Sequence, residues 1–555
     1  MRIWAARLGM QMLAGAALAG AWLAGLMVAW PVEAWAQGAQ EKPAPSGDAP
    51  AAAPRSRLTL SGEFRSDAYR QEDFFLGARA ADTLGSGTYG DDNAFWTQRL
   101  TLRPRLILSD DLNFNMSLDL AHGVWGIDNQ PPDRDRPGFS NLYNNKSNSF
   151  HLQADWAFLS YRHRGTGTRW YLGRQQYGLG NLLVLDMDAP GLQVYKDLDR
   201  WHTSVGGGYA KMSEGTDGLV DADLWTGPGR PDSVGDGRDA DLYYAEVRYQ
   251  SPGRGLMLNP FLVYYIDRSN ADGSTYLPNE QGFLDARFRP NISRARVLGL
   301  AARAERGVFR LEAEADLLQG VDRVNNLNSG AGEELGRNNG DLTGTNIFGR
   351  LTMNQSRLTL GAAFGFGSGR ELAFDHTSEG NFNSLRTQGN FYLTEVWEDG
   401  LALDELGIVP EGLGSPFVRG YRGLENTLLF QVFGGFRLRN NLNVTGSYNI
   451  IRANEPVRAW HDRNGDGVIS PSGDEFGYEA NDPNRVSTAT DLGTEIDARI
   501  DWTLDGMVQL SLRGGIFSPG LAAGYLINGT GAYQESAKEI RFGVRVPIPE
   551  FSLGG

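Results

Sequence analysis

The chain has 555 residues, a net charge of −15 and an isoelectric point near 5.0, which excludes the concentrated basic surface that nucleic-acid binding needs. It contains no cysteine, so disulfides, thiolate zinc sites and a cysteine nucleophile are also excluded. The length suits either several ordinary domains or one large all-β unit.

The N-terminus has the three parts of a secretory signal peptide. Two arginines precede an apolar stretch over residues 10–30, and a small-x-small cleavage site ends at Ala36. We expect residues 1–36 to be removed; an uncleaved anchor is the alternative, because the apolar stretch is long. Residues 37–56 are rich in Pro, Ala and Gly and are predicted to form a flexible periplasmic lead-in. No later segment approaches ~18 consecutive apolar residues, the length of a membrane-spanning helix.

From Arg57 to the C-terminus, apolar and polar residues alternate with a period of two. In residues 112–120, Leu, Phe and Met stand at alternate positions, with Asn, Ser and Asp between them. Residues 492–502 repeat the pattern with charges at alternate positions. Charges spaced in this way cannot follow one face of a helix, whereas a strand with one apolar and one polar face has this pattern.

The alternating segments number about eighteen, an even count that places both chain ends on the same side of a barrel. They are residues 57–66, 93–108, 112–124, 150–163, 169–176, 191–195, 201–212, 240–250, 256–267, 293–304, 308–318, 345–354, 357–367, 427–438, 442–452, 489–503, 507–516 and 538–547.

The connections between these segments are alternately short and long. Short turns such as 109–111 and 504–506 alternate with long polar loops such as 125–149 and 368–426. A soluble β-sandwich shares the strand pattern but has short connections at both ends. The asymmetry is typical of outer-membrane barrels, which have short periplasmic turns and long extracellular loops. We therefore predict an all-β fold, a single antiparallel transmembrane barrel over residues 57–555, in the Gram-negative outer membrane.

Such a barrel implies partners. We expect outer-membrane lipid and lipopolysaccharide around its exterior, the barrel-assembly machinery during insertion, and no nucleic acid. About eighteen strands enclose a water-filled lumen, lined by the faces opposite the apolar ones. Alternation places arginines and acids on this inner face in similar numbers. The predicted lumen residues include Arg99, Arg103, Arg105, Arg248, Arg310, Glu312, Glu495, Asp497, Arg499, Arg541 and Arg545.

Two interpretations of these charges are open. Arg99, Arg103 and Arg105 on one strand, with Arg541 and Arg545 near closure, form a positive ladder that would set selectivity electrostatically. Alternatively, the charges only pair across strands and keep the lumen wet.

Residues 177–188 break the alternation with an apolar run, Leu182-Leu183-Val184-Leu185. An apolar loop there would be poorly placed in water. One hypothesis is that it folds into the barrel as a constriction; the other is that it is the upper part of a strand pair.

Two stretches resemble the alginate-export family of outer-membrane barrels. Residues 171–175 (YLGRQ) are similar to that family's strand-ending Gly-Arg-Gln, and residues 491–497, with 514–520 downstream, are similar to its C-terminal signature. The resemblance implies an eighteen-stranded barrel that conducts an anionic polysaccharide through an arginine-rich lumen, with periplasmic export components as partners. It assigns Arg174, Glu495, Asp497 and Arg499 to the lumen, although alternation from Leu172 also allows Arg174 to point outward. A general diffusion porin for small solutes, or a non-transport adhesin or structural barrel, are the alternatives.

The stretch His461 to Ser470 resembles the first nine positions of an EF-hand-type calcium loop. Position twelve is Gly473 instead of an acid, so Asp474 would close the site by a bulged path. The loop 462–475 therefore predicts a Ca²⁺ site, and an ordinary Asp/Asn/Gly turn cluster is the alternative. Its candidate ligands are Asp462, Asn464, Asp466, the Val468 carbonyl, Ser470 and Asp474.

The six histidines do not lie in a recognisable Ser/His/Asp or metal-ligand pattern. We therefore expect no catalytic residues and no enzyme.

Overall fold

The computed structural model describes the strands, the short turns between them and parts of the longer connections. The described residues are 56–74, 76–77, 93–124, 153–213, 240–253, 255–267, 292–325, 337–369, 393–400, 424, 426–458, 487–528, 531 and 534–553. The predicted signal peptide, residues 37–55 of the predicted lead-in and the predicted calcium loop lie outside them.

The strands form one closed antiparallel sheet of 18 members in which each strand pairs with its neighbours in sequence. The first nine are β1 (Arg57–Glu72), β2 (Asn93–Ser109), β3 (Leu112–Val124), β4 (Gln153–His163), β5 (Thr168–Gly178), β6 (Asp186–Leu198), β7 (Thr203–Ser213), β8 (Ala240–Gln250) and β9 (Leu256–Asp267). The other nine are β10 (Ile292–Arg306), β11 (Phe309–Asn325), β12 (Arg337–Gln355), β13 (Leu358–Gly367), β14 (Thr427–Arg439), β15 (Leu442–Arg458), β16 (Thr488–Leu504), β17 (Val508–Pro519) and β18 (Ala537–Leu553).

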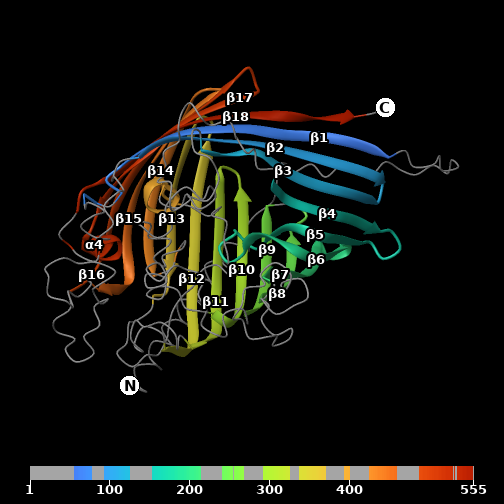
Figure 1. The fold of residues 1–555 in the computed structure, drawn as a ribbon, viewed down its shortest axis with the longest axis horizontal. Coiled ribbons are helices and arrows are strands. Elements are labelled where there is room, and N and C mark those ends of the chain that lie inside the picture. Colours follow the sequence, from blue (N-terminus) through green and yellow to red (C-terminus); the bar gives the residue numbers. More distant parts are fainter. Residues whose placement is uncertain are drawn as a thin grey trace, which may run out of the picture.

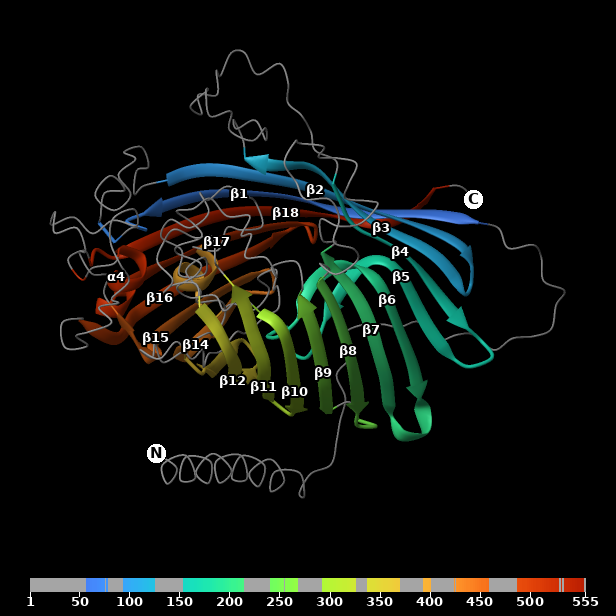
Figure 2. The same ribbon diagram turned by 60° about the horizontal axis from the view of Figure 1, so that its bottom comes forward.

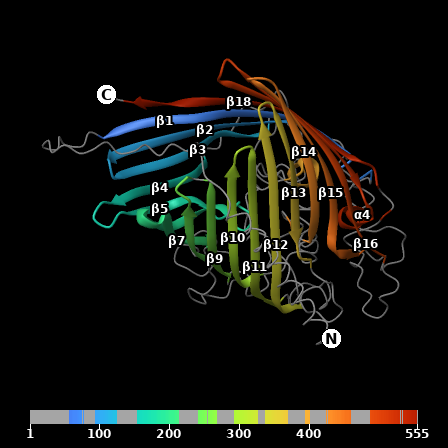
Figure 3. The same ribbon diagram turned by 180° about the vertical axis from the view of Figure 1, so that it is seen from behind.

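The first and last strands close the barrel. β1 and β18 run side by side in Figure 1 and pair along nearly their whole length, from Leu58 opposite Leu553 to Glu72 opposite Lys538. Figure 3 shows β9 to β16 as a continuous wall on the other side. Closure gives every strand two neighbours, so no edge is left with unpaired backbone groups.

The alternation of residue types sorts side chains between the two faces of this wall. On β16, Ile496 is 60% exposed, whereas its neighbours Glu495 and Asp497 are 0% and 6% exposed. Large apolar side chains such as Leu298, Leu317 and Val432 are likewise exposed on the outer face. The barrel is therefore apolar outside and polar inside, as a barrel that spans a lipid bilayer must be.

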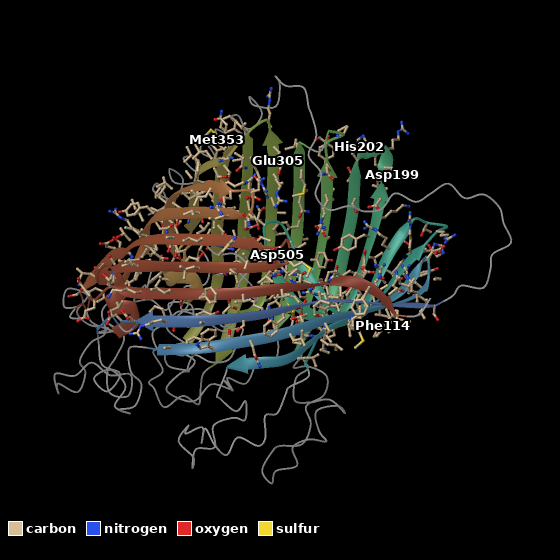
Figure 4. The ribbon with its side chains drawn as sticks, turned by 90° about the horizontal axis from the view of Figure 1, so that it is seen from above. Phe114, Asp199, His202, Glu305, Met353 and Asp505 are labelled. Atoms are coloured by element: carbon tan, nitrogen blue, oxygen red, sulfur yellow. The ribbon has the colours of Figure 1, made fainter. Side chains whose placement is uncertain are left out.

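The short connections gather at one end of the barrel. In Figure 4, His202, Glu305 and Met353, which lie at or beside three of these turns, stand in a row along one edge. Exposed aromatic side chains, including Tyr161, Trp170 and Trp502, belong to strand segments near this end. This placement matches the aromatic girdle of a membrane interface.

All eighteen predicted strands are present, with corrections to their limits and connections. β6 starts at Asp186, not at residue 191, and β1 continues to Glu72, beyond the predicted residue 66. The connection between β17 and β18 contains α4 (Leu521–Asn528), and the predicted loop 368–426 contains the single-turn π-helix η2 (Glu395–Gly400). Among the described residues, no helix is long and apolar enough to cross a membrane.

Candidate functional site

The connection between β13 and β14 places residues 393–400 against the inner face of the barrel. The backbone N–H groups of Glu395, Val396 and Trp397 donate to the carboxylate of Glu495, with N···O distances of 2.8, 2.7 and 2.8 Å. Three successive N–H groups around one carboxylate form an anion-binding nest. A buried strand residue thus holds η2, the gold coil in Figure 2, inside the ring of strands.

Three further contacts anchor the same segment. Arg513 of β17 donates to Glu395 at 3.2 Å, and Gln431 of β14 donates its amide N–H to the Leu393 carbonyl. The ring of Trp397 lies 4.9 Å from that of Phe517. The segment is therefore fixed to β14, β16 and β17 by charge, hydrogen bonds and aromatic packing together.

A second segment, residues 179–185, enters the lumen from the opposite wall, between β5 and β6. Asn181 donates its backbone N–H to the carboxylate of Glu314 on β11 and its amide to the Ala313 carbonyl at 3.0 Å. Gly180 donates to Asn259 of β9 at 3.3 Å. Because β11 lies six strands from β5 in the sheet order, the segment crosses the interior. These contacts support the constriction hypothesis for residues 177–188.

The two segments share one apolar cluster. Leu183 of the second segment is buried in the same cluster as Leu393, Val396 and Trp397 of the first, together with Phe348 from the wall. Burying these side chains removes them from water, which offsets the cost of ordering two loops. The lumen is therefore narrowed from two sides by segments that meet around a common core.

Arginines form two rows on the wall from β16 to β2. In the first row, the strand register sets Arg499 opposite Arg513, and Arg513 opposite Arg541. In the second, Arg545, Arg65 and Arg99 are opposite one another on β18, β1 and β2.

Most of these guanidinium groups have a carboxylate partner. Asp67 accepts from Arg65 at 2.7 Å and from Arg541 at 3.3 Å, and Arg545 pairs with Glu63. Arg499 pairs with Asp501 at 2.8 Å, and Arg99 lies 3.9 Å from Asp119. The arginines and carboxylates thus largely neutralise one another along this wall.

Arg103 and Arg105 differ from the others. They follow Arg99 along β2 on the same face, opposite Ser61 and Thr59, and both side chains are exposed. Neither forms an ion pair with any carboxylate in the part of the chain that the structure describes. They are therefore positive charges open to lumen water.

A polar cavity of about 640 Å³ lies beside the first infolded segment. Its charged lining consists of Arg310, Glu312, Arg350, Glu395, Asp497, Arg499 and Arg513. Thus β11, β12, β16, β17 and the infolded segment contribute to one site. Glu312 pairs with Arg310 at 2.6 Å and Glu395 pairs with Arg513. Asp497 accepts from Ser447 at 2.8 Å through Oδ2, while its Oδ1 has no donor among the described residues. The four arginines outnumber the three acids.

The predicted site residues are distributed as follows. Arg310, Glu312, Asp497 and Arg499 come together at the cavity, whereas Arg248 is bound to Glu246 at 2.7 Å elsewhere on the wall. Arg174 does not share the inner face. It stands on the side of Trp170 and Leu172, which is 57% exposed, and donates to the Asp155 carbonyl at 2.7 Å. The outward alternative for Arg174 is therefore the one observed.

Sequence reasoning missed the residues that the infolded segment supplies. Residues 392–397 were included in one long extracellular loop, although Leu393, Val396 and Trp397 give it an apolar character like that of residues 177–188. The same argument, that an apolar loop is poorly placed in water, would have identified this segment.

The predicted Ca²⁺ loop 462–475 lies outside the described residues, so its site remains a prediction. Within the described ranges, no group of three or more His, Cys, Asp or Glu side chains is arranged to hold a metal ion.

Comparison with known families and with curated proteins finds no match. Solved structures with a similar fold include OccK2 (OpdF) of Pseudomonas aeruginosa, at 11% identity over 90% of this chain and 98% of that chain, with a TM-score of 0.46. Others are OpdK of P. aeruginosa with vanillate (10%, 89% and 99%, TM-score 0.46) and a BenF-like porin from Pseudomonas fluorescens Pf-5 (11%, 90% and 99%, TM-score 0.46). None of them favours the alginate-export family over other porin-like barrels.

Closure, the apolar exterior and the polar, charged interior together define the class of protein. The chain is a Gram-negative outer-membrane β-barrel of 18 strands, with two infolded segments that narrow its lumen.

Proposed function

We propose that the barrel is a passive channel for small hydrophilic solutes that carry negative charge. The observation that carries this proposal is the polar cavity beside residues 393–400, whose charged lining is four arginines and three acids. A solute carboxylate or phosphate would accept hydrogen bonds from these guanidinium groups. The cavity's size, about 640 Å³, is within the range of small-molecule sites.

A long polysaccharide fits this lumen less well, contrary to the first expectation from the sequence. A polymer in transit needs a continuous passage, and residues 179–185 and 393–400 are both anchored in the interior by buried carboxylates. A polymer would therefore have to displace these segments, whereas a small solute could diffuse past them. We further propose that lipid and lipopolysaccharide surround the apolar exterior and that the barrel-assembly machinery inserts the chain.

Planar-bilayer recordings test the proposal directly. We expect a reversal potential in a salt gradient that shows anion preference, and reversible current block by small carboxylates at concentrations where a neutral sugar of similar size has no effect. Cation preference, or block only by long anionic polysaccharide, would contradict it.

A further inference from the structure

Two carboxylates on the inner face of β11 are buried without a counter-charge from any described residue. Glu314 is 2% exposed and Asp316 is 3% exposed, and they stand two residues apart on the same face of the strand. The neighbouring strand β12 places Asn346, also 3% exposed, directly opposite Asp316. Three oxygen-bearing side chains are thus gathered on two paired strands.

Four oxygen atoms in this group have no hydrogen-bond donor among the residues that the structure describes. They are Oε1 of Glu314, Oδ1 and Oδ2 of Asp316, and Oδ1 of Asn346. The second carboxylate oxygen of Glu314 is occupied, because it accepts the backbone N–H of Asn181. Buried polar atoms are nearly always paired, and each exception points to a missing donor, water or ion.

The neighbouring Glu246 differs from these two acids because it has a counter-charge. It is equally buried, but Arg248 donates to it at 2.7 Å and Asn259 at 2.9 Å. Neither Glu314 nor Asp316 forms an ion pair with a described Arg or Lys side chain. A buried carboxylate without a counter-charge is costly, because burial removes its hydration.

We propose that Glu314, Asp316 and Asn346 bind a divalent cation of the Ca²⁺ type. All the free ligand atoms are carboxylate or amide oxygens, which hard cations prefer. Two carboxylates carry the charge that one divalent ion cancels, and the Asn346 amide adds a neutral oxygen across the strand pair. Water completes the coordination shell. This is a site of two acids and an amide, separate from the predicted loop at 462–475.

The ion would also secure the second infolded segment. Gly180 lies against the carboxylate of Glu314, so a Cβ there would overlap it, and Asn181 binds the same group. A cation that neutralises Glu314 and Asp316 therefore stabilises the platform on which residues 179–185 rest.

The test measures bound metal in purified, refolded barrel carrying Asp466→Ala, which removes the candidate loop site. After chelation, equilibrium dialysis against Ca²⁺ and elemental analysis give the number of ions per chain. We expect one ion in this parent and a loss of that ion, or at least a tenfold weaker affinity, in the isosteric double variant Glu314→Gln/Asp316→Asn. Glu312→Gln is the matched control, because Glu312 shares the strand and face but is paired with Arg310; it should bind like the parent.

Circular dichroism and heat-modified gel mobility establish that each variant forms the barrel. A folded parent that binds no ion, or a folded double variant that binds as many as the parent, overturns the proposal. Because the readout is metal content and not conductance, the result is independent of whether the channel prefers anions.

Discussion

The carboxylate of Glu495 accepts the backbone N–H of Val396 at 2.7 Å, although the two residues are 99 positions apart in the chain. Glu495 is a residue of the barrel wall, and Val396 belongs to a connection that begins at the far end of β13. The first N–H groups of a helical turn have no acceptor within the turn, and the carboxylate of Glu495 accepts their hydrogen bonds. The wall therefore specifies where the infolded segment sits, and the segment specifies the width of the lumen.

Substitution of Glu495 by Gln should release residues 393–400. The amide presents N–H groups to a nest of N–H donors, so at least one charged hydrogen bond, worth about 1.5–3 kcal/mol, is lost. We expect a larger single-channel conductance and more current noise while the barrel stays folded, measured in planar bilayers.

Asp501→Asn is the control for this variant. It removes the same charge from the same face of β16, but among the described residues its carboxylate pairs only with the wall residue Arg499. We expect its conductance to stay close to that of the wild type. Equal conductance in both variants would show that Glu495 does not hold the segment.

Gly180→Ala should displace the second segment from β11. Gly180 has φ +59°, and an added methyl group would overlap the carboxylate of Glu314. The control is Gly167→Ala in a short turn, where φ is +67° and no described residue lies within 4 Å of the added Cβ. In both variants an alanine must adopt a left-handed backbone conformation, which costs about 1–2 kcal/mol. The two variants therefore differ only in the overlap with Glu314. Conductance should rise in Gly180→Ala alone; a rise in both would point to general loosening of the barrel.

The strand pattern could be predicted from the sequence because its causes are local. Alternation needs only the residues of one strand, and the even spacing of short turns then orders the strands around the ring. β1, β11 and β15 end later in the chain than predicted. These strands continue beyond the apolar outer surface, where backbone hydrogen bonds to the neighbouring strands maintain them without alternation of residue type.

The constriction could be predicted only in part, because its partners are distant in sequence. The apolar run after β5 suggested that residues 177–188 fold inward, but nothing local indicated Glu314 as its acceptor. Similarly, Glu495 was expected to line the lumen, whereas it is wholly buried under η2. Arg174 shows a different difficulty. Alternation allowed its side chain to face inward or outward, and the family resemblance favoured the lumen, whereas the structure places it on the outer face.

Gly515→Ala tests the close approach of the first segment to β17. A Cβ at Gly515 would lie 2.7 Å from Cγ2 of Val396 and against the carboxylate of Asp497, so the segment must shift. Gly349→Ala on β12 is the control, because its Cβ would meet no described residue within 4 Å. We expect a lower thermal midpoint and altered conductance for Gly515→Ala only. Indistinguishable thermal midpoints and conductances would mean that the segment does not pack against Gly515.

The charge preference of the channel should depend on Arg103 and Arg105, because they lack a carboxylate partner among the described residues and are exposed to the lumen. Their field acts over the Debye length, about 10 Å at 0.1 M salt but only about 3 Å at 1 M. The double variant Arg103→Gln/Arg105→Gln should therefore shift the reversal potential toward cations at low salt, with the shift shrinking as salt rises. Arg164→Gln removes an arginine that pairs with Asp110 and Asp111 at the turns, and it should leave the reversal potential unchanged. If the two sets of variants behave alike, net charge alone, and not the position of these arginines in the lumen, sets the selectivity.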